Sequence, residues 1–434
     1  MLKKHKLAIS FLWIMILILL PAPLVYLLAK NLVDTKENVI IYGLGVLAYF
    51  WWLVSVYLST RPKWIEKEIG LPQMYLFHGV LGIFSLAFAM AHKLLAFSID
   101  ETIKDVGNWA LYLALFSILY AIFFLSGWVV DRFPITKNIK NKCQFVLKHQ
   151  VSVWIHRLNF VIIGLIWLHV HLIGRITSIR SFIILFDLYT IVILAKYIQY
   201  KFIETHLEKY HGQLVENHPL DKETQKIVIR LGKKVAPYKA GDIFFLRFKK
   251  NAAISQEAHP FSVSSAPSYS RKQVQFTIQR LGDYTKKISE VPLGSQVYLE
   301  GPFGMLDEIV QFSIQKKQSV VLYGLGSGIA PLLSLALEYG NSCSMHVIWS
   351  IHQDATPYYH QEFLKLQEEN SRFQYDVKKS RYTLEDLTSI IDKSEIEHAK
   401  FIIVGSASVV LKVESNLKKL GVTKKQIVDE RLTM

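Results

Sequence analysis

Residues 74–97 read MYLFHGVLGIFSLAFAMAHKLLAF, and this stretch decides the fold of the first half of the chain. It contains no acidic residue, and its single lysine lies close to its end. A helix needs about 20 apolar residues to cross a hydrocarbon core about 30 Å thick. The stretch therefore predicts a membrane-spanning helix.

Similar apolar stretches precede and follow it, which gives six predicted spans in all. The spans cover residues 7–29, 39–60, 74–97, 109–130, 151–174 and 181–203. From about His206 onward the sequence is polar and punctuated by glycine and proline, as in globular domains. A chain of 434 residues is long enough for two or three domains. We therefore expect a six-helix transmembrane domain over residues 1–205, followed by a globular half.

The formal net charge of +15 raises the question of a nucleic-acid partner. The basic residues, however, cluster beside the apolar runs instead of forming one long basic face. On one side of the predicted bundle they are Lys3, Lys4, Lys6, Arg61, Lys63, Lys67, Arg132, Lys137, Lys140, Lys142 and Lys148, whereas the opposite loop is acidic, with Asp100, Glu101 and Asp105. Because positive residues stay inside, we expect a multi-pass protein of the plasma membrane and no nucleic-acid binding. The N-terminus and the globular half are then cytoplasmic.

The first span also admits interpretation as a cleaved signal peptide, since a charged start precedes an apolar run. Pro21-Ala22-Pro23 is a poor cleavage site and the run continues to Ala29, which favours an uncleaved anchor. The two cysteines, Cys143 and Cys343, lie in different predicted domains. They imply neither a disulfide framework nor a cysteine metal site.

Histidines occur in the third and fifth spans, where they are costly and usually face the bundle interior with a partner or a function. His78 and His92 are fourteen residues apart in the third span. Along a helix this is roughly 21 Å, and the two positions lie within about 40° of one face. One helix thus presents two imidazoles at two depths.

The fifth span carries His156 near its start, followed by His169 and His171. In an ideal helix His169 lies about 140° away from the face of His156, whereas His171 lies about 60° away. Geometry alone slightly favours His171, although a kink near Gly164 would bring His169 round. A single membrane histidine usually has a structural or proton-relaying role. Two pairs at matching depths instead predict two stacked haems between facing helices.

Short alternating strands follow between Gln213 and Glu300 and predict a small antiparallel barrel. The barrel contains the segment His259–Ser262, and a later strand ends in Arg280, just before a predicted helix start that includes Thr285. Free backbone N–H groups at a helix start favour phosphate. Together, these segments predict a flavin site.

A strand, a glycine-rich turn and an amphipathic helix come next, at residues 320–323, 324–331 and 332–337. Glycines let the backbone approach a pyrophosphate at the N-terminus of such a helix. Later strands at Met345–Ser350 and 400–404 complete an α/β domain. Its ligand face is expected at the carboxyl ends of the strands.

These residues resemble the NADPH oxidase and ferric reductase transmembrane family, especially its short prokaryotic members. The resemblance covers nearly the whole chain and is carried by the membrane histidines, His156-Arg157-Leu158, the flavin motif and the glycine turn. It implies an α-helical six-span bundle followed by a cytoplasmic ferredoxin-NADP reductase-like module. In that module, an FAD-binding antiparallel β-barrel covers residues 206–311 and an NAD(P)H-binding α/β domain covers residues 312–434.

In the family, the histidine spacings of the third and fifth helices are fourteen and thirteen, which selects His169 over His171. The resemblance implies two b-type haems. His78 and His156 are then the ligands of the cytoplasmic-side haem, and His92 and His169 those of the outer haem. Arg157 is a candidate partner of a haem propionate, although basic residues at membrane boundaries often serve only as anchors.

The resemblance also implies the nucleotide contacts. The flavin ring is expected to contact His259, Pro260, Phe261 and Ser262, and the FAD phosphates Arg280 and Thr285. The nicotinamide dinucleotide turn is formed by Gly324, Gly326, Gly328 and Pro331, with Gly405 close by.

Three departures from the family pattern concern the electron donor. Val404 replaces a cysteine usually placed by the nicotinamide, and Leu432 replaces the C-terminal aromatic residue that commonly covers the flavin. The basic residue that reads a 2′-phosphate is not evident, and Arg381 is a candidate for it. NADPH is therefore only slightly favoured over NADH.

The implied activity carries electrons from NAD(P)H through FAD and two haems to dioxygen, producing superoxide. Because cofactors supply the chemistry, no catalytic side chain is expected. The closest alternative is a ferric or cupric reductase with the same electron path, and a quinone or membrane protein is a further possible acceptor. A non-enzymatic alternative is a six-span transporter with a nucleotide-sensing domain. No protein partner is evident in the sequence.

Overall fold

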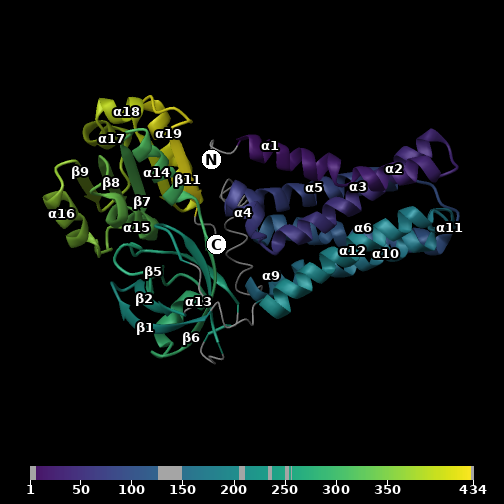
Figure 1. Cartoon of the computed structure of the whole chain (residues 1–434), viewed down its shortest axis with the longest axis horizontal. Coiled ribbons are helices and arrows are strands. Elements are labelled where there is room, and N and C mark those ends of the chain that lie inside the picture. The colour runs from purple at the N-terminus through teal and green to yellow at the C-terminus, as the bar shows by residue number, and fades with distance from the viewer. Residues whose placement is uncertain are drawn as a thin grey trace. The chain divides into compact units, whose positions relative to one another are not determined.

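The computed structural model describes residues 6–125, 149–204, 211–232, 237–249, 254–255 and 257–431. The chain divides into two compact units after Glu204, and Figure 1 labels many of the elements of each. Several residues considered above lie outside the described part: Lys3, Lys4, Arg132, Lys137, Lys140, Cys143, Lys142, Lys148, His206 and Leu432.

Within its described residues, 6–125 and 149–204, the first unit contains six helices that are long and apolar enough to cross a membrane. Its elements are α1 (Lys6–Ile14), η1 (Met15–Leu19), α2 (Ala22–Asn31), α3 (Lys36–Ser59), α4 (Lys63–Ile69), α5 (Leu71–Leu95), α6 (Glu101–Tyr120), η2 (Ala121–Leu125), α9 (His149–His156), α10 (Asn159–Leu172), α11 (Gly174–Thr177), α12 (Arg180–Ile198) and η3 (Gln199–Ile203). All six predicted spans are present in the predicted order.

The fourth span differs from the prediction because α6 begins at Glu101 and not near residue 109. Asp100 caps this helix, and its carboxylate accepts a hydrogen bond of 3.0 Å from the backbone N–H of Ile103. Such a cap satisfies an N–H group that the helix itself leaves unpaired. The acidic residues expected in a loop therefore form the start of a helix.

The second span, α3, is the most buried of the six, and nearly all of its side chains from Ala48 to Leu58 are buried. The first span also packs within the unit. Trp13 stacks on Phe77 of α5 with ring centroids 3.8 Å apart, and Leu24 and Leu28 of α2 are each 1% exposed. This packing is the behaviour expected of an anchor that belongs to the bundle.

The second unit begins with a six-stranded antiparallel sheet. Its elements are β1 (His211–Pro219), β2 (Thr224–Leu231), β3 (Ile243–Phe248), β4 (His259–Ser262), β5 (Gln273–Gln279), α13 (Asp283–Lys286), η6 (Ile288–Glu290) and β6 (Gln296–Phe303). The strand order is β4-β3-β6-β1-β2-β5. A bridge between Val263 and Phe276 joins the two edges, so the sheet closes into the predicted barrel around a buried apolar core.

A five-stranded parallel sheet follows, with helices on both faces. Its elements are α14 (Leu306–Gln315), β7 (Val320–Leu325), η7 (Gly326–Gly328), α15 (Ile329–Tyr339), β8 (Met345–Ser350), α16 (His360–Glu369), β9 (Phe373–Lys378), α17 (Leu384–Ile390), α18 (Lys393–His398), β10 (Lys400–Gly405), α19 (Ala407–Lys419) and β11 (Ile427–Arg431). In the strand order β11-β10-β7-β8-β9, β8 and β9 follow on one side of β7, and β10 and β11 follow on its other side. The switch point of the strand order therefore lies between β7 and β10. Open α/β sheets bind ligands at such a switch point, beyond the carboxyl ends of the strands.

The predicted fold class is therefore confirmed: a six-helix apolar bundle precedes an antiparallel FAD-type barrel and an α/β domain. The predicted boundary at residue 311 inside the second unit stays a prediction. Leu306, Ile309 and Val310 of α14 pack in the same apolar core as the strands of the parallel sheet.

A buried charged cluster fastens one end of the parallel sheet. His346 of β8 is 2% exposed. Its Nδ1 lies 3.2 Å from Glu395 of α18, and its Nε2 lies 2.9 Å from Asp376 of β9. Burial opposes the charged imidazole, but hydrogen bonds to Asp376 and Glu395 outweigh it and raise the pKa of His346 to about 9.

This cluster predicts a specific pH dependence of stability. Because the pKa of His346 in the folded protein exceeds the ordinary value of 6.5, its contribution is complete below pH 6.5 and is lost as the pH rises through about 9. We expect it to amount to at most about 3 kcal/mol. The melting temperature of the second unit, followed by release of flavin fluorescence, falls across this range.

In His346→Asn, the same fall in melting temperature should be largely absent. The matched control is His398→Asn, because His398 lies on α18 with a side chain that is 78% exposed. An identical pH profile in His346→Asn and the parent protein would contradict the assignment.

Candidate functional site

The flavin motif forms the edge strand β4, which pairs antiparallel with β3. His259 and Phe261 point to the barrel side, where the His259 ring lies 4.0 Å from the Tyr284 ring. Burial raises the pKa of the Tyr284 hydroxyl, so this group stays protonated and donates a hydrogen bond of 3.1 Å to Leu246 O. Phe261 is buried in the barrel core, whereas Pro260 is exposed. Pro260 and Ser262 therefore lie on the more accessible face of this strand, and their contact with a flavin ring stays a prediction.

Arg280 and Thr285 lie at the end of β5 and in the following turn. The backbone N–H of Arg280 donates to Glu223 O at 2.7 Å, and its guanidinium contacts Lys222 O. The Thr285 hydroxyl accepts hydrogen bonds of 3.0 Å from the backbone N–H groups of both Leu281 and Gly282. The predicted helix is only one turn long. Thr285 thus shapes the turn behind Arg280.

The dinucleotide turn lies next to this flavin region within the same unit. The Ser327 hydroxyl donates to the Gln279 side chain at 3.2 Å, which joins the glycine turn to the strand that ends in Arg280. Gly326 has a φ of +58°, a region that favours glycine. A Cβ on Gly328 would lie 2.2 Å from Val404 O, so only glycine lets the turn approach β10 this closely.

Other predicted residues surround the same turn. A Cβ on Gly405 would lie 2.5 Å from the Cβ of Leu325, so Gly405 packs directly against the end of β7. Pro331 lies in the first turn of α15. The indole N–H of Trp349, a fully buried residue of β8, donates to Gly326 O at 3.0 Å. Trp349 was not predicted, because no sequence motif marks a core tryptophan that supports a turn.

Basic residues gather where β9 ends beside β8. The backbone N–H of Ile351 bonds to Lys378 O at 3.0 Å, and the Lys378 ammonium pairs with Asp386 at 2.6 Å. Lys379 and Arg381 are exposed just beyond. The structure therefore places Arg381 near the end of the strand that neighbours β8, at the carboxyl edge of the sheet.

Hydrogen bonds brace the barrel against the α/β domain. The buried hydroxyl of Tyr359 lies 2.5 Å from that of Thr277 and accepts from the Gln275 side chain at 3.0 Å. The Ser334 hydroxyl accepts from the backbone N–H of Gly241 at 3.0 Å and donates to Ser265 O at 2.6 Å. The sequence carried no signal for these contacts, since each joins residues far apart in the chain.

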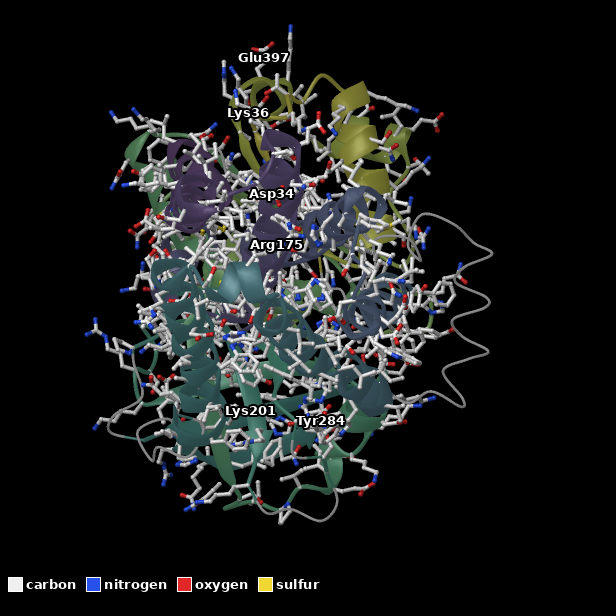
Figure 2. The ribbon with its side chains drawn as sticks, turned by 90° about the vertical axis from the view of Figure 1, so that its right-hand side faces the viewer. Asp34, Lys36, Arg175, Lys201, Tyr284 and Glu397 are labelled. Atoms are coloured by element: carbon white, nitrogen blue, oxygen red, sulfur yellow. The ribbon has the colours of Figure 1, made fainter. Side chains whose placement is uncertain are left out.

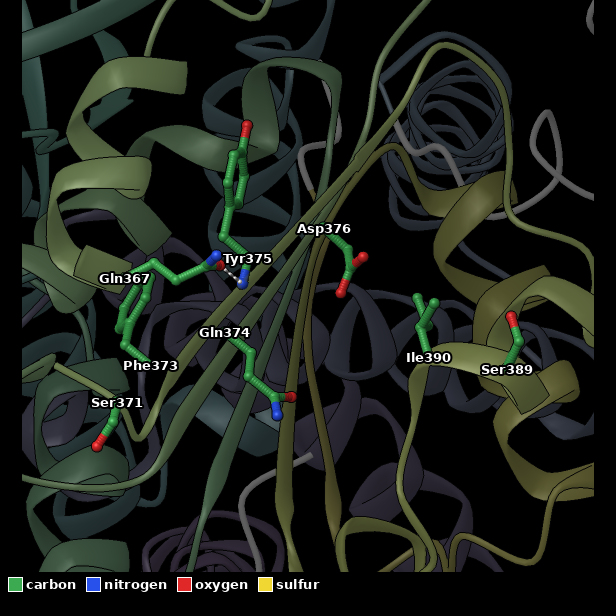
Figure 3. Close-up of a pocket in the computed structure, with 8 residues that line it drawn as sticks. All are labelled: Gln367, Ser371, Phe373, Gln374, Tyr375, Asp376, Ser389 and Ile390. Carbon is green, nitrogen blue, oxygen red and sulfur yellow. Dashed lines mark hydrogen bonds between the residues drawn. The ribbon is translucent and has the colours of Figure 1, made fainter.

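A separate open groove runs along the edge strand β9, as Figure 3 shows. Its lining residues are Gln367, Ser371, Phe373, Gln374, Tyr375, Asp376, Ser389 and Ile390. The Gln367 side chain accepts from the backbone N–H of Tyr375 at 2.9 Å, which covers part of the unpaired strand edge. None of the predicted nucleotide residues lines this groove.

The first unit brings the four selected histidines together in two pairs. The rings of His78 and His156, the inner pair, have centroids 5.9 Å apart. The rings of His92 and His169, the outer pair, have centroids 6.5 Å apart and planes inclined at 84°. Two imidazoles that bind one metal ion from opposite sides, with bonds of about 2 Å, have their centres roughly 6 Å apart.

Three of these rings are oriented by a backbone carbonyl on a neighbouring helix. Nδ1 of His78 lies 2.8 Å from Ser55 O, Nδ1 of His92 lies 2.8 Å from Ile41 O, and Nδ1 of His169 lies 3.0 Å from Ile103 O. A carbonyl oxygen only accepts, so each Nδ1 carries the proton and each Nε2 keeps its lone pair. This is the usual support for a metal-ligating histidine.

Glycines make room for the outer pair. A Cβ on Gly45 of α3 would lie 3.2 Å from the His92 ring, and one on Gly107 of α6 would lie 3.0 Å from the His169 ring. By contrast, a Cβ on Gly43 would meet no atom within 4 Å. The rings therefore occupy space that only glycine leaves open.

His171, the alternative ligand, lies elsewhere. Its ring stacks on Trp167 at 4.0 Å, and its Nε2 lies 3.4 Å from Asp187 of α12. The fifth span is interrupted between His156 and Asn159, where tight backbone bonds include Phe160 N–H to Arg157 O. Such tighter winding adds rotation, so His169 rather than His171 faces His92. The break thus lies at residues 157–158 and not near Gly164, where a kink was expected. Arg157 lies at this break, and its guanidinium carbon is 4.6 Å from the centroid of the Trp154 ring.

The interior of the described bundle also contains buried polar atoms without a hydrogen-bond partner. They are Trp51 Nε1, Ser85 Oγ, Asn108 Oδ1 and Ser117 Oγ. Buried polar groups are normally hydrogen-bonded, so a polar cofactor between these helices fits the unit. No group of three or more His, Cys, Asp and Glu side chains gathers for a metal ion in the described residues.

Comparisons with known proteins find an FAD-binding domain in the second unit. Residues 210–323 match a family described as an FAD-binding domain, whereas no curated protein sequence matches the chain. The chain is similar to the FAD/NAD-binding domain of nitric oxide dioxygenase from Vibrio cholerae, with 18% identity over 51% of this chain and 98% of that one and a TM-score of 0.43. It is also similar to ferredoxin-NADP+ reductase from Plasmodium falciparum, with 17% identity over 53% of this chain and 100% of that one and a TM-score of 0.43. For ferredoxin-NADP+ reductase from Neisseria gonorrhoeae, the identity is 17% over 51% of this chain and 97% of that one, and the TM-score is 0.41.

The structural likenesses are too distant to argue function. The family match itself covers the barrel and the first strand of the parallel sheet. The second unit therefore contains an FAD-binding domain, which supports a flavin oxidoreductase module in a chain with six potential membrane spans.

The turn behind Arg280 predicts how FAD affinity responds to substitution. Thr285→Val removes the oxygen that accepts two backbone hydrogen bonds, so the turn loosens and the affinity falls roughly ten-fold, or about 1.4 kcal/mol. Thr285→Ser retains the hydroxyl and the affinity. Titration of the apoprotein with FAD, followed by flavin fluorescence, measures both.

Ser289→Ala is the matched control, because the Ser289 hydroxyl is exposed and bonds only to Lys286 O nearby. Parent-like FAD affinity in Thr285→Val would show that this turn does not contribute to FAD binding.

Proposed function

We propose that the protein is a transmembrane NAD(P)H oxidase that passes electrons from NAD(P)H, through FAD and two b-type haems, to dioxygen outside the cell and produces superoxide. The observation that carries the proposal is the pair of facing histidine sets at two depths of a six-helix unit, in a chain with an FAD-binding domain. A transporter needs neither feature.

The histidines have the chemistry to hold haem iron. His78 and His156 would ligate the inner haem, and His92 and His169 the outer one. The carbonyl bonds to Nδ1 fix the ring orientation for three of the four and leave Nε2 of each with its lone pair. For His156, the Asn159 amide nitrogen lies 3.4 Å from Nδ1, and an amide N–H donates, so this contact does not place the proton on Nδ1.

The second unit supplies the donor side. FAD held by this unit would supply the chemistry that converts hydride transfer from NAD(P)H into single-electron transfer, and haems held by the histidine pairs would supply the one-electron path across the membrane. Pro260 and Ser262 offer the flavin face, Arg280 the charge for its phosphates, and Gly324, Gly326 and Gly328 the turn for the nicotinamide dinucleotide. Lys379 and Arg381 favour NADPH, since both cations are exposed where a 2′-phosphate would approach the strand ends.

The membrane orientation follows from charge. Arg61 and Lys63 lie at the end of the bundle nearest to the inner pair, and Lys196 and Lys201 lie toward the end of the last span. Because positive residues stay inside, this end is cytoplasmic in a plasma membrane. The acceptor then approaches the outer pair, and dioxygen needs no proton donor for reduction to superoxide.

An anaerobic visible spectrum of the detergent-purified protein with FAD tests the proposal. NADPH should reduce two haems, and admission of air should reoxidise them with a signal that superoxide dismutase suppresses. A slower reduction by NADH is expected from the cations at the strand ends. Reduced haem that persists in air but is reoxidised by a ferric chelate would identify a metal reductase, and a protein without haem would refute both functions.

The glycine cradle gives a sharper test of the ligands. Gly107→Ala and Gly45→Ala place a methyl group against the rings of His169 and His92, so the purified protein should retain about one haem per chain instead of two. Gly43→Ala is the matched control on the same helix as Gly45. Haem content from the pyridine haemochrome spectrum decides the outcome, and two haems in both cradle variants would argue against the outer pair as ligands.

A further inference from the structure

An ion pair joins two connections between spans of the first unit, near the outer pair. Asp34 lies between α2 and α3, and Arg175 lies in α11, between the fifth and sixth spans. Arg175 Nη1 lies 2.6 Å from Asp34 Oδ2, and Figure 2 shows the two labelled residues next to each other. The pair thus connects segments 141 residues apart in the chain.

The carboxylate of this pair is held firmly in place. Its Oδ1 accepts hydrogen bonds from the Asn38 side chain at 2.7 Å and the Thr35 backbone N–H at 2.8 Å. These bonds, from Asn38 first and then Thr35, lower the pKa of Asp34, so the group is ionised at neutral pH. The Asp34 side chain is 11% exposed and that of Arg175 is 50% exposed. An anchored and mostly covered carboxylate distinguishes this pair from freely moving surface ion pairs.

The guanidinium of Arg175 also contacts the helix that supports His92. Its Cζ lies 5.1 Å from the centroid of the Tyr42 ring, and that ring lies 6.3 Å from the His92 ring. The preceding residue, Ile41, accepts the Nδ1 hydrogen bond of His92. Two consecutive residues of α3 therefore touch His92, and Arg175 packs on one of them.

Arg175 is at the same time tied to the other ligand of the outer pair. It lies in α11, directly after the helix α10 that carries His169. The contacts of Arg175 with Asp34 and Tyr42 thus connect the His169 helix to the part of α3 that orients His92. The inner pair has a different support, from Ser55 and Asn159.

We propose that Arg175 is a positioning residue, which acts through Asp34 and Tyr42 to fix the spacing and the mutual ring angle of His92 and His169. The inference rests on the proposed function, since these two histidines matter as a pair only if they bind one iron. The role is mechanical: Arg175 holds two helix ends at a set separation and does not itself touch the reacting atoms.

Low-temperature EPR and redox titration of the purified ferric protein test this role. Two low-spin haem signals are expected from the parent, because the ring planes of the inner and outer pairs are inclined at 63° and 84°. Arg175→Gln should shift or abolish the outer signal and its midpoint potential and leave the inner signal unchanged. A merely structural loss would alter both signals together.

Three further variants sharpen the test. Arg180→Gln, at an exposed arginine that begins α12, is the matched control and should leave both signals unchanged. Exchange of the charges, with Asp34→Arg and Arg175→Asp in one chain, should not restore the outer signal, because Asn38 and Thr35 donate to the carboxylate at position 34 and Tyr42 packs against the cation at position 175. If Arg175→Gln does not accumulate, Tyr42→Leu removes the ring between the cation and His92 and should change the same signal.

The outcomes separate the inference from the function. Absence of haem from the parent protein refutes the proposed function. Two haems in the parent with unchanged outer signals in Arg175→Gln and Tyr42→Leu overturn the positioning role and leave the function intact. Equal changes in both signals also overturn the positioning role, because Arg175 would then affect the whole bundle and not the outer pair in particular.

Discussion

The hydrogen bond from a histidine Nδ1 to a backbone carbonyl of the neighbouring helix is the interaction on which the membrane unit depends. It occurs at Ser55, Ile41 and Ile103, so α3 and α6 orient rings carried by α5 and α10. Within a bilayer, no hydrophobic force draws helices together, and polar contacts and close packing decide their arrangement. The same bonds leave Nε2 of His78, His92 and His169 with its lone pair.

Two further features support the outer pair: the glycines beside its rings and the ion pair of Arg175 with Asp34. Gly45 and Gly107 create the space that the outer rings fill, and the anchored ion pair ties the ends of the helices that carry and orient them. In the second unit, glycine has a similar purpose at Gly328, where the turn touches Val404 O. Both parts of the protein thus obtain close approaches by leaving out a side chain.

The second unit is built for fixed geometry between its two domains. Tyr359 and Ser334 place hydroxyl groups in the barrel surface, and Ser327 bonds to the strand that ends in Arg280. The flavin region and the dinucleotide turn are therefore held at a constant separation. A short distance between donor and flavin is the condition that hydride transfer requires.

The sequence alone determined the six apolar spans, the barrel and the α/β domain, because length, hydrophobicity and strand or helix periods are local properties. It also indicated His78 and His92, whose spacing keeps them on one helix face. Between His169 and His171, helix geometry alone slightly favoured His171 and the family resemblance favoured His169; only the tertiary structure places the His169 ring beside that of His92, because the fifth span is broken after His156 and His171 lies against Asp187. The support from Trp349 and the contacts of Arg175 likewise depend on segments far apart in the chain, which no local pattern records.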